Sequence, residues 1–168
     1  MRQGYIAGLM LLVAVAGCED DKAKGLLAPA ALPTQAVRAY VVQEPGATAE
    51  KVTLTIHVEA RGIPVAAYQG KLEFDADALE IIDASTPGED GTRIVNAKAH
   101  PGVVKFAGFS AEAFLHTAAV TLVVKPKKPL ELANLLATLD VVGEAKGTQV
   151  AKEHVLLQKG VFTTIAKQ

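Results

Sequence analysis

The stretch Val52-Thr53-Leu54-Thr55-Ile56-His57-Val58-Glu59 carries the clearest structural signal in the chain. Apolar residues occupy every second position, with threonine, histidine and glutamate between them. Side chains of a β-strand point alternately to the two faces of a sheet, so this period of two predicts a strand with one buried face. His57 falls in the polar phase, which predicts an imidazole that faces solvent.

Similar segments lie on both sides of this strand and are separated by turn signals such as Pro101-Gly102. The predicted strands are 37–43, 52–59, 70–74, 79–84, 93–97, 103–109, 120–124, 137–142 and 161–165. About nine short strands joined by turns rich in glycine and proline predict an all-β domain, either a sandwich or a barrel.

Three segments depart from the strand pattern. Ser110–Phe114 and Pro129–Leu136 contain residues that favour helix, so short helical turns are predicted there. The turn at Lys125–Lys128 predicts solvated lysines. The alternative for that turn is a contact with anionic lipid.

The segment from Phe74 to Gly88 reads Phe-Asp-Ala-Asp-Ala-Leu-Glu-Ile-Ile-Asp-Ala-Ser-Thr-Pro-Gly. An aromatic-Asp corner, a leucine, β-branched residues and a Pro-Gly turn, in this order, resemble the cohesin domain. Other strands follow in the family's order, so the resemblance covers about Ala36 to Ala166. It implies a nine-stranded jelly-roll β-sandwich, related in fold to a group of carbohydrate-binding modules.

Cohesins bind dockerins, which are small calcium-loaded helical modules, through one sheet face. The resemblance therefore implies a protein-binding module and no enzyme. Type I cohesins often carry Asn-x-Asp on the strand that leads to the aromatic-Asp corner, whereas this chain has Ala67-Tyr68-Gln69. This departure leaves the partner open between a dockerin-like module and another protein of the cell envelope.

Strand phase gives a candidate binding face. When the apolar phases of strands 70–74 and 103–109 point into the core, the intervening polar side chains and one phenylalanine point outward. The predicted face consists of Gln69, Lys71, Glu73, Lys105 and Phe109. An exposed Phe109 among charged residues would resemble an interface anchor within a polar rim. Alternatively, the segment Ser110–Phe114 covers that ring.

The first residues predict export and lipidation. Arg2 precedes an uncharged apolar run, Tyr5 to Ala16, which is shorter than the ~20 residues of a membrane span and typical of a secretory signal. The run ends in Val15-Ala16-Gly17-Cys18, which resembles the lipobox of bacterial lipoproteins. That resemblance implies that Cys18, the only cysteine, receives a diacylglycerol and anchors the mature protein to a membrane of the cell envelope, on its periplasmic or extracellular side.

These features divide the chain into three parts. Residues 1–17 are the predicted lipoprotein signal peptide. Residues 18–35, which are rich in alanine, proline and charge, are the lipidated cysteine and a flexible tether. Residues 36–168 are the cohesin-like domain.

Composition excludes several functions. The chain has 17 Lys+Arg and 18 Asp+Glu with no basic stripe, which argues against nucleic-acid binding. No cofactor is predicted, since the sequence contains neither a phosphate-binding glycine loop nor a Gly-x-Ser-x-Gly motif. The four histidines stand at no metal-ligand spacing, so no metal is predicted. At Asp75 and Asp77, local capping is favoured over a calcium site.

Two other functions remain as alternatives to protein binding. Polysaccharide binding suits the related fold, but tryptophan is absent and aromatic residues make up 5% of the chain. A purely structural subunit of an envelope complex is the second alternative.

Overall fold

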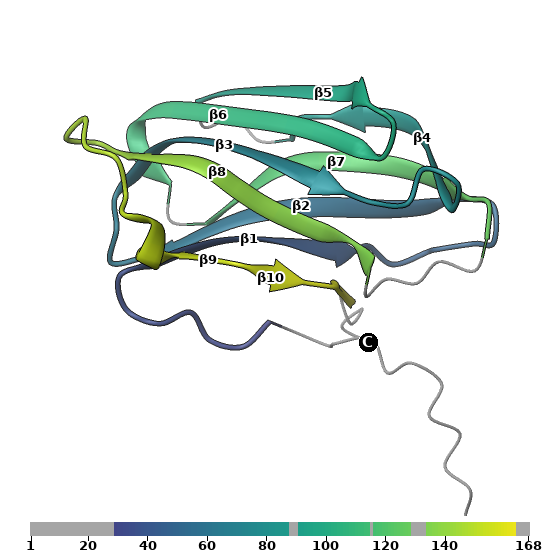
Figure 1. Ribbon diagram of the computed structural model, residues 1–168, viewed down its shortest axis with the longest axis horizontal. Helices are drawn as coiled ribbons and strands as arrows, with labels where there is room; N and C mark the ends of the chain where they lie inside the picture. The colour runs from purple at the N-terminus through teal and green to yellow at the C-terminus, as the bar shows by residue number, and fades with distance from the viewer. Residues whose placement is uncertain (1–28, 88–90, 115, 129–133, 164–168) are drawn as a thin grey trace, which may run out of the picture.

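The computed structural model describes residues 29–87, 91–114, 116–128 and 134–163, which form a sandwich of two β-sheets (Figure 1). A short 3-10 turn, η2 (Lys152–His154), lies near the end of the described chain. The strands are β1 (Ala36–Gln43), β2 (Val52–Arg61), β3 (Val65–Glu73), β4 (Leu79–Ser85), β5 (Thr92–His100), β6 (Val103–Phe114), β7 (His116–Pro126), β8 (Leu136–Glu144), β9 (Val155–Leu156), β10 (Gln158–Lys159) and β11 (Val161–Thr163).

The six-stranded sheet has the order β11-β1-β2-β7-β4, and β9 also pairs with β1. The five-stranded sheet has the order β10-β8-β3-β6-β5. Within the first sheet, β1 runs parallel to β9 and β11, whereas every other pair in both sheets is antiparallel. The strands β3 and β6 therefore have neighbours on both sides, and β4 and β5 each end a sheet.

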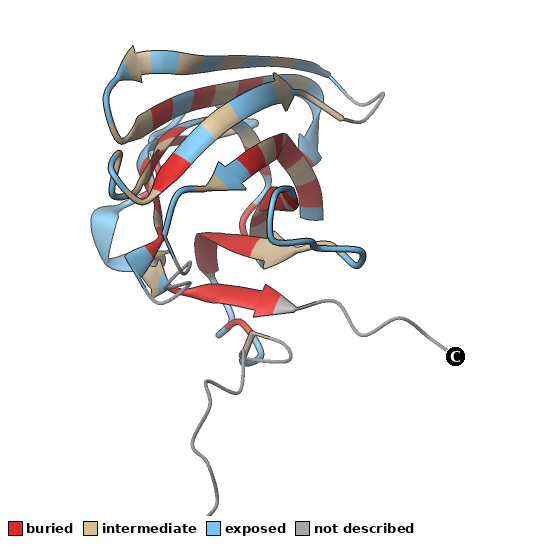
Figure 2. Ribbon diagram, turned by 90° about the vertical axis from the view of Figure 1, so that its right-hand side faces the viewer, coloured by how far each residue is buried: buried red, intermediate tan, exposed pale blue. Residues whose placement is uncertain are grey.

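The core lies between the two sheets and comes from the apolar phase of the strands. Leu54 and Ile56 of β2 meet this core from one sheet, while Leu72 and Val104 meet it from the other, and all four side chains are fully buried. Figure 2 shows buried and exposed residues alternating along the strands. The period of two in the sequence thus corresponds to one core face and one outer face per sheet.

Each of the nine predicted strands falls on a strand of the structure, with 164–165 of the last one outside the described residues, so the predicted jelly-roll sandwich is confirmed. Two short strands, β9 and β10, are additional. The predicted helical turn at Ser110–Phe114 is wrong, because β6 continues through these residues. Phe114, 5% exposed, pairs with Val65 of β3 and joins the core, so tertiary packing overrides the local helix preference. Of the other predicted helix, 129–133 lies outside the described residues and Leu136 begins β8.

The aromatic-Asp corner is closed by its own hydrogen bonds. The amide of Asp77 donates to Asp75 Oδ1 at 2.9 Å, and the amide of Leu79 donates to the Asp75 carbonyl at 3.1 Å. Within the described residues, no group of three or more histidine, cysteine or acidic side chains is placed to hold a metal ion. The Asp75 carboxylate serves as a turn cap, because its Oδ1 accepts the hydrogen bond from the Asp77 amide.

The segment before β1 is docked on the domain where it is described. Leu32 is 2% exposed, and Arg61 Nη1 donates a hydrogen bond of 2.8 Å to its carbonyl. The predicted signal peptide, Cys18 and the first part of the predicted tether lie outside the described residues. Within the part of the chain that is described, no helix is long and apolar enough to cross a membrane.

Candidate functional site

The outer face of the five-stranded sheet is a regular grid of side chains. Its centre is formed by β3 and β6, with β8 and β5 on either side. Residues that are partners across the sheet form rows, which read from β8 to β5 as Gly143–Ala67–Phe109–Thr92, then Val141–Gln69–Ala107–Ile94, then Thr138–Lys71–Lys105–Asn96. The first two rows are mainly apolar or small, and the third is polar.

The first two rows enclose a shallow hollow of about 310 Å³, which we call the apolar dish. Ile94, Phe109 and Val141 frame it, and Ala67 and Ala107 provide much of its floor. The framing side chains are 60%, 57% and 42% exposed, and they are three of the five large exposed hydrophobic residues in the described chain. Such a cluster on an outer sheet face is typical of an interaction site.

Glycine and tyrosine support the dish from below. Tyr68 of β3 and Gly108 of β6 are Cα partners that face the core. A Cβ added at Gly108 would overlap the Tyr68 ring, so only glycine allows the ring to lie there. Tyr68 in turn packs edge-on against Phe114, with ring centroids 5.4 Å apart. The dish therefore rests on a rigid part of the core.

The structure brings the predicted candidate residues together on this one face. Gln69 and Phe109 line the dish, and Lys71 and Lys105 are Cα partners in the next row. Glu73 lies two residues after Lys71 on β3, and its Oε1 atom forms an ion pair with Lys71 Nζ at 3.0 Å. Phe109 is exposed, and the segment after it continues strand β6, so the alternative in which Ser110–Phe114 covers the ring is wrong.

Two framing residues, Ile94 and Val141, are absent from the sequence prediction. Each stands beside another apolar residue, Val95 or Val142, so alternation does not reveal which of the two points outward. The register between β3 and β8 also shifts between Gln69 and Gly70, and this shift changes the phase of β8 near Val141. The burial of Val142 and the 42% exposure of Val141 settle the orientation.

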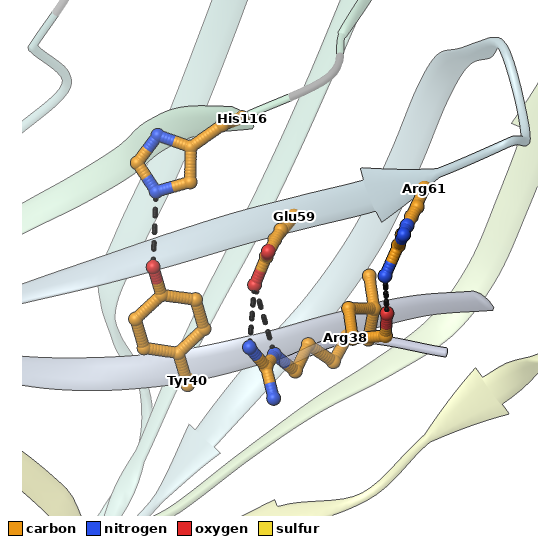
Figure 3. A network of polar contacts seen from close by, with 6 residues as sticks. Arg38, Tyr40, Glu59, Arg61 and His116 are labelled. Atoms are coloured by element: carbon orange, nitrogen blue, oxygen red, sulfur yellow. Dashed lines mark hydrogen bonds and ion pairs between the residues drawn. The ribbon is translucent and has the colours of Figure 1, made fainter. Parts of the chain in front are cut away.

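A polar network crosses the outer face of the six-stranded sheet (Figure 3). Arg38 Nε and Nη2 both donate to Glu59 Oε2, at 3.0 and 2.6 Å. Tyr40 Oη and His116 Nε2 share a hydrogen bond of 2.9 Å. The ring of His57 stacks against Tyr40 and His116, with centroids 5.3 and 5.0 Å away. Arg38 and Tyr40 are buried, so this network ties β1, β2 and β7 together.

His57 lies on the outer face of its sheet, as strand phase predicts, but its imidazole is only partly exposed because the rings of Tyr40 and His116 stack against it. Burial lowers the pKa of His57 below its ordinary value of 6.5, and the adjacent His116 lowers this pKa further. Both histidines come from distant segments of the sequence, and only the pairing of β2 with β7 brings them together.

This pKa shift predicts that the domain loses stability as the pH falls. The unfolded chain takes up a proton at His57 more readily than the folded chain, so the free energy of unfolding decreases as the pH drops below about 6.5. Urea unfolding at pH 7.5 and 5.5 measures this slope, and His57→Gln is expected to reduce it. His100→Gln, on the other sheet, is the control, and equal slopes in all three proteins would refute the assignment.

A second hollow, of about 800 Å³, lies between the edge strands β4 and β5. Half-buried, core-facing residues such as Ile81 and Val95 line it, together with charged residues of both signs. The register of β4 shifts between Ile81 and Asp83, and that of β5 between Asn96 and His100. Such irregularities disfavour the pairing of a further strand at the edge of a sheet. This groove is where the two sheets meet at their edges, and it is a weaker candidate for a binding site than the apolar dish.

No family model matches the chain, and no curated protein matches it. Solved structures do match. The cohesin module of a Clostridium perfringens family 33 glycoside hydrolase is 16% identical with a TM-score of 0.56, and the match covers 77% of this chain and 99% of that module.

Two cohesins solved in complex with dockerins also match over almost their whole length. A type I cohesin–dockerin complex from Clostridium thermocellum is 9% identical with a TM-score of 0.54, covering 76% of this chain and 99% of that one. The sixth cohesin of Acetivibrio cellulolyticus scaffoldin B, in complex with a mutant Cel5 dockerin, is 14% identical with a TM-score of 0.53, covering 78% and 98%. The sandwich described above therefore has the cohesin fold.

Proposed function

We propose that this domain is a non-catalytic protein-binding module whose contact face is the outer face of the five-stranded sheet. The observation that carries the proposal is the apolar dish, where three large hydrophobic side chains remain exposed on a rigid, glycine-supported floor. A polar row containing Lys71 and Lys105 borders it. An apolar centre with a polar border is the usual composition of a protein interface.

The fold supports the same proposal. Cohesin modules that match the chain have been solved in complex with dockerins, so a sandwich of this shape serves protein recognition in those proteins. The backbone of the central strands β3 and β6 is paired on both sides. Recognition on this face therefore uses side chains, because β3 and β6 have no unpaired backbone to which a partner could add a strand.

The proposal includes a membrane anchor. The lipobox-like sequence that ends at Cys18 supports lipidation, and residues 19–28 would connect the lipid to the docked segment around Leu32. An anchored domain meets partners of the same envelope at high local concentration, so a modest affinity is sufficient.

Phe109→Ala is expected to weaken partner binding by about 10- to 100-fold, since large aromatic side chains at an interface centre contribute most of the binding energy. Its effect on folding stability is expected to stay within about 0.5–1 kcal/mol, because the ring is largely exposed. The partner is first recovered from the native envelope with the wild-type domain and then purified. Binding of that purified protein is measured by calorimetry for wild type, Phe109→Ala and Ile94→Ala.

Lys125→Ala is the matched control, because Lys125 is exposed on β7 of the other sheet. It is expected to bind like wild type. If Phe109→Ala and Ile94→Ala also bind like wild type, the apolar dish is not the contact face. A glycan array that binds the wild-type domain but not Phe109→Ala would instead assign the face to polysaccharide.

Cys18→Ala is expected to release the exported protein from the membrane fraction, since no acyl chain can then be attached. Metabolic labelling with an alkyne-bearing fatty acid should mark the wild-type protein and leave this variant unmarked. An unlabelled wild-type protein, or a variant that stays in the membrane fraction, would contradict the proposed anchor.

A further inference from the structure

The edge of the sandwich at β4 and β5 leaves part of the core uncovered. These two strands end the two sheets on the same side of the molecule (Figure 1), and the groove of about 800 Å³ lies between them. Ile81 and Val95 face the core here, yet both are only partly buried and line the groove. In the middle of the sheets, core-facing Leu54 and Val104 are fully buried. The groove therefore exposes apolar surface that one copy of the chain does not cover.

An apolar side chain projects beside this groove. Ile82 lies at the irregularity of β4, where its two neighbours pair with β7 and it has no partner on that strand itself. Its side chain is 56% exposed and borders the groove. The same edge of the molecule thus carries both an apolar projection and an apolar hollow.

Opposite charges lie on the two walls of the groove. On β4, Asp83 is exposed, and its Oδ1 accepts a hydrogen bond of 2.9 Å from the amide of the next residue. On β5, Lys98 is exposed. Within the described parts of the chain, neither side chain forms an ion pair, whereas the other acid of the groove, Glu80, lies 4.0 Å from Lys127 Nζ. Each wall therefore presents one charge without a counter-charge.

These features are complementary to one another, which favours a second copy of the chain as the occupant. In a two-fold symmetric contact a patch meets itself, so the patch must contain both halves of every interaction. The groove edge meets this requirement for the apolar contact and for the charges. Contact between the copies uses side chains, because the irregular edges of β4 and β5 disfavour pairing of their backbones.

We infer that two copies of this chain associate through the β4–β5 groove as a two-fold symmetric dimer. Ile82 of each copy enters the groove of the other, and Asp83 of each copy lies against Lys98 of the other. Seventeen of the described residues line the groove, fewer than the ~20–30 residues per side of a stable interface. The dimer is therefore weak and reversible, and it depends on a high local concentration of the chain.

The dimer leaves the apolar dish free. Ile94 and Val95 are consecutive on β5, and Ile94 lines the dish on the outer face while Val95 lines the groove on the inner face. Two associated copies would present two dishes, so a partner with two matching sites would bind more tightly than to one copy. The inference concerns a different surface from the proposed function and does not rest on it.

Crosslinking in intact membranes tests the contact with the full chain. Two copies with different epitope tags are produced in the same cells and treated with a water-soluble carbodiimide, which joins a carboxylate to an amine that lies against it. We expect a dimer that carries both tags, with Asp83 joined to Lys98 in its peptide map. Asp83→Lys and Lys98→Asp alone should each lower the yield about fivefold or more. Producing these two variants together should restore the mixed dimer, because opposite charges then face each other at both contacts.

The apolar contact is tested with the charged pair left intact. Ile82→Asp is expected to lower the dimer yield about fivefold or more, because a carboxylate would have to enter the apolar groove. Ile94→Asp is the matched control, since this isoleucine is 60% exposed on the outer face of the neighbouring edge strand. It should crosslink like wild type. Circular dichroism verifies that both variants are folded.

Every outcome decides the inference. It is overturned by the absence of a wild-type dimer, by a dimer without the link between Asp83 and Lys98, or by equal yields for Ile82→Asp and wild type. Failure of the two charge variants to form the mixed dimer would also overturn it. The proposed function is decided separately, because Ile82→Asp should bind the purified partner like wild type in the calorimetry described above.

Discussion

Replacing Tyr68 with alanine is expected to lower the free energy of unfolding by about 3–5 kcal/mol, the usual range for a large aromatic side chain removed from a core. Tyr68 is 1% exposed and lies between the two sheets. Its ring contacts Phe114 and Phe106 at centroid distances of 5.4 and 6.3 Å, and it occupies the space that a side chain at position 108 would need. The neighbours cannot collapse fully into the vacated volume, because sheet pairing holds them.

Urea unfolding, followed by circular dichroism, measures this loss. Tyr68→Phe is the matched control, since it keeps the ring and removes only the hydroxyl, and a change of about 1 kcal/mol is expected. Because Tyr68 supports the floor of the apolar dish, the alanine variant should also bind the partner more weakly than its remaining folded fraction explains. A loss below about 1 kcal/mol for Tyr68→Ala would mean that the ring is not part of the core.

Glu59→Gln is expected to lower the free energy of unfolding by about 3 kcal/mol, near the lower end of the range for breaking a buried ion pair. The side chain of Arg38 is 5% exposed, and two of its nitrogens donate to a single oxygen of Glu59. Without that carboxylate, a guanidinium that carries a full charge stays buried with a neutral neighbour. Glu59 itself is 28% exposed, so water can offset part of the loss.

The same difference in burial predicts an asymmetry between the two partners. Arg38→Met is expected to be milder than Glu59→Gln, because it removes the buried charge and leaves a carboxylate that water can reach. The double variant should resemble Arg38→Met alone. A double-mutant cycle from urea unfolding gives the coupling energy. If Arg38→Met were the more damaging change, the contact of the Arg38 guanidinium with the Tyr40 ring, whose centroid lies 5.2 Å from Cζ, would outweigh the cost of burying the charge.

The strands were predictable because apolar and polar side chains alternate along them. This alternation depends only on neighbouring residues in the sequence and shows which side chains share a face of the sheet. In β3 the apolar phase ends at Leu72, so the outward direction of Lys71 and Glu73 follows directly. Alternation fails where two apolar residues are adjacent, as at Ile94 and Val95, and where an irregular register shifts the phase, as in β8. Ile94 and Val141, two of the three residues that frame the apolar dish, therefore became visible only in the folded chain, whereas Phe109 was predicted.

Features that depend on strand order could not be predicted. His57 and His116 stack because β2 pairs with β7, and no local pattern encodes that pairing. The buried pair of Arg38 and Glu59 likewise requires the register between β1 and β2. The predicted helical turn at Ser110–Phe114 is wrong for the opposite reason. The local preference of these residues for helix is weaker than the free energy gained by burying Phe114 in the core.

The parallel pairing of β1 with β9 and β11 has a consequence for the order in which the chain folds. Val41, at the beginning of the domain, is the register partner of Val161, near its end, so the first strand gains its outer neighbours only when the last strands are available. Contacts between such distant residues slow folding, because the chain must close a long loop before it gains their energy. If the protein is exported as proposed, the six-stranded sheet lacks β9 and β11 until these strands have crossed the membrane. The native sheet can therefore form only on the far side of the membrane.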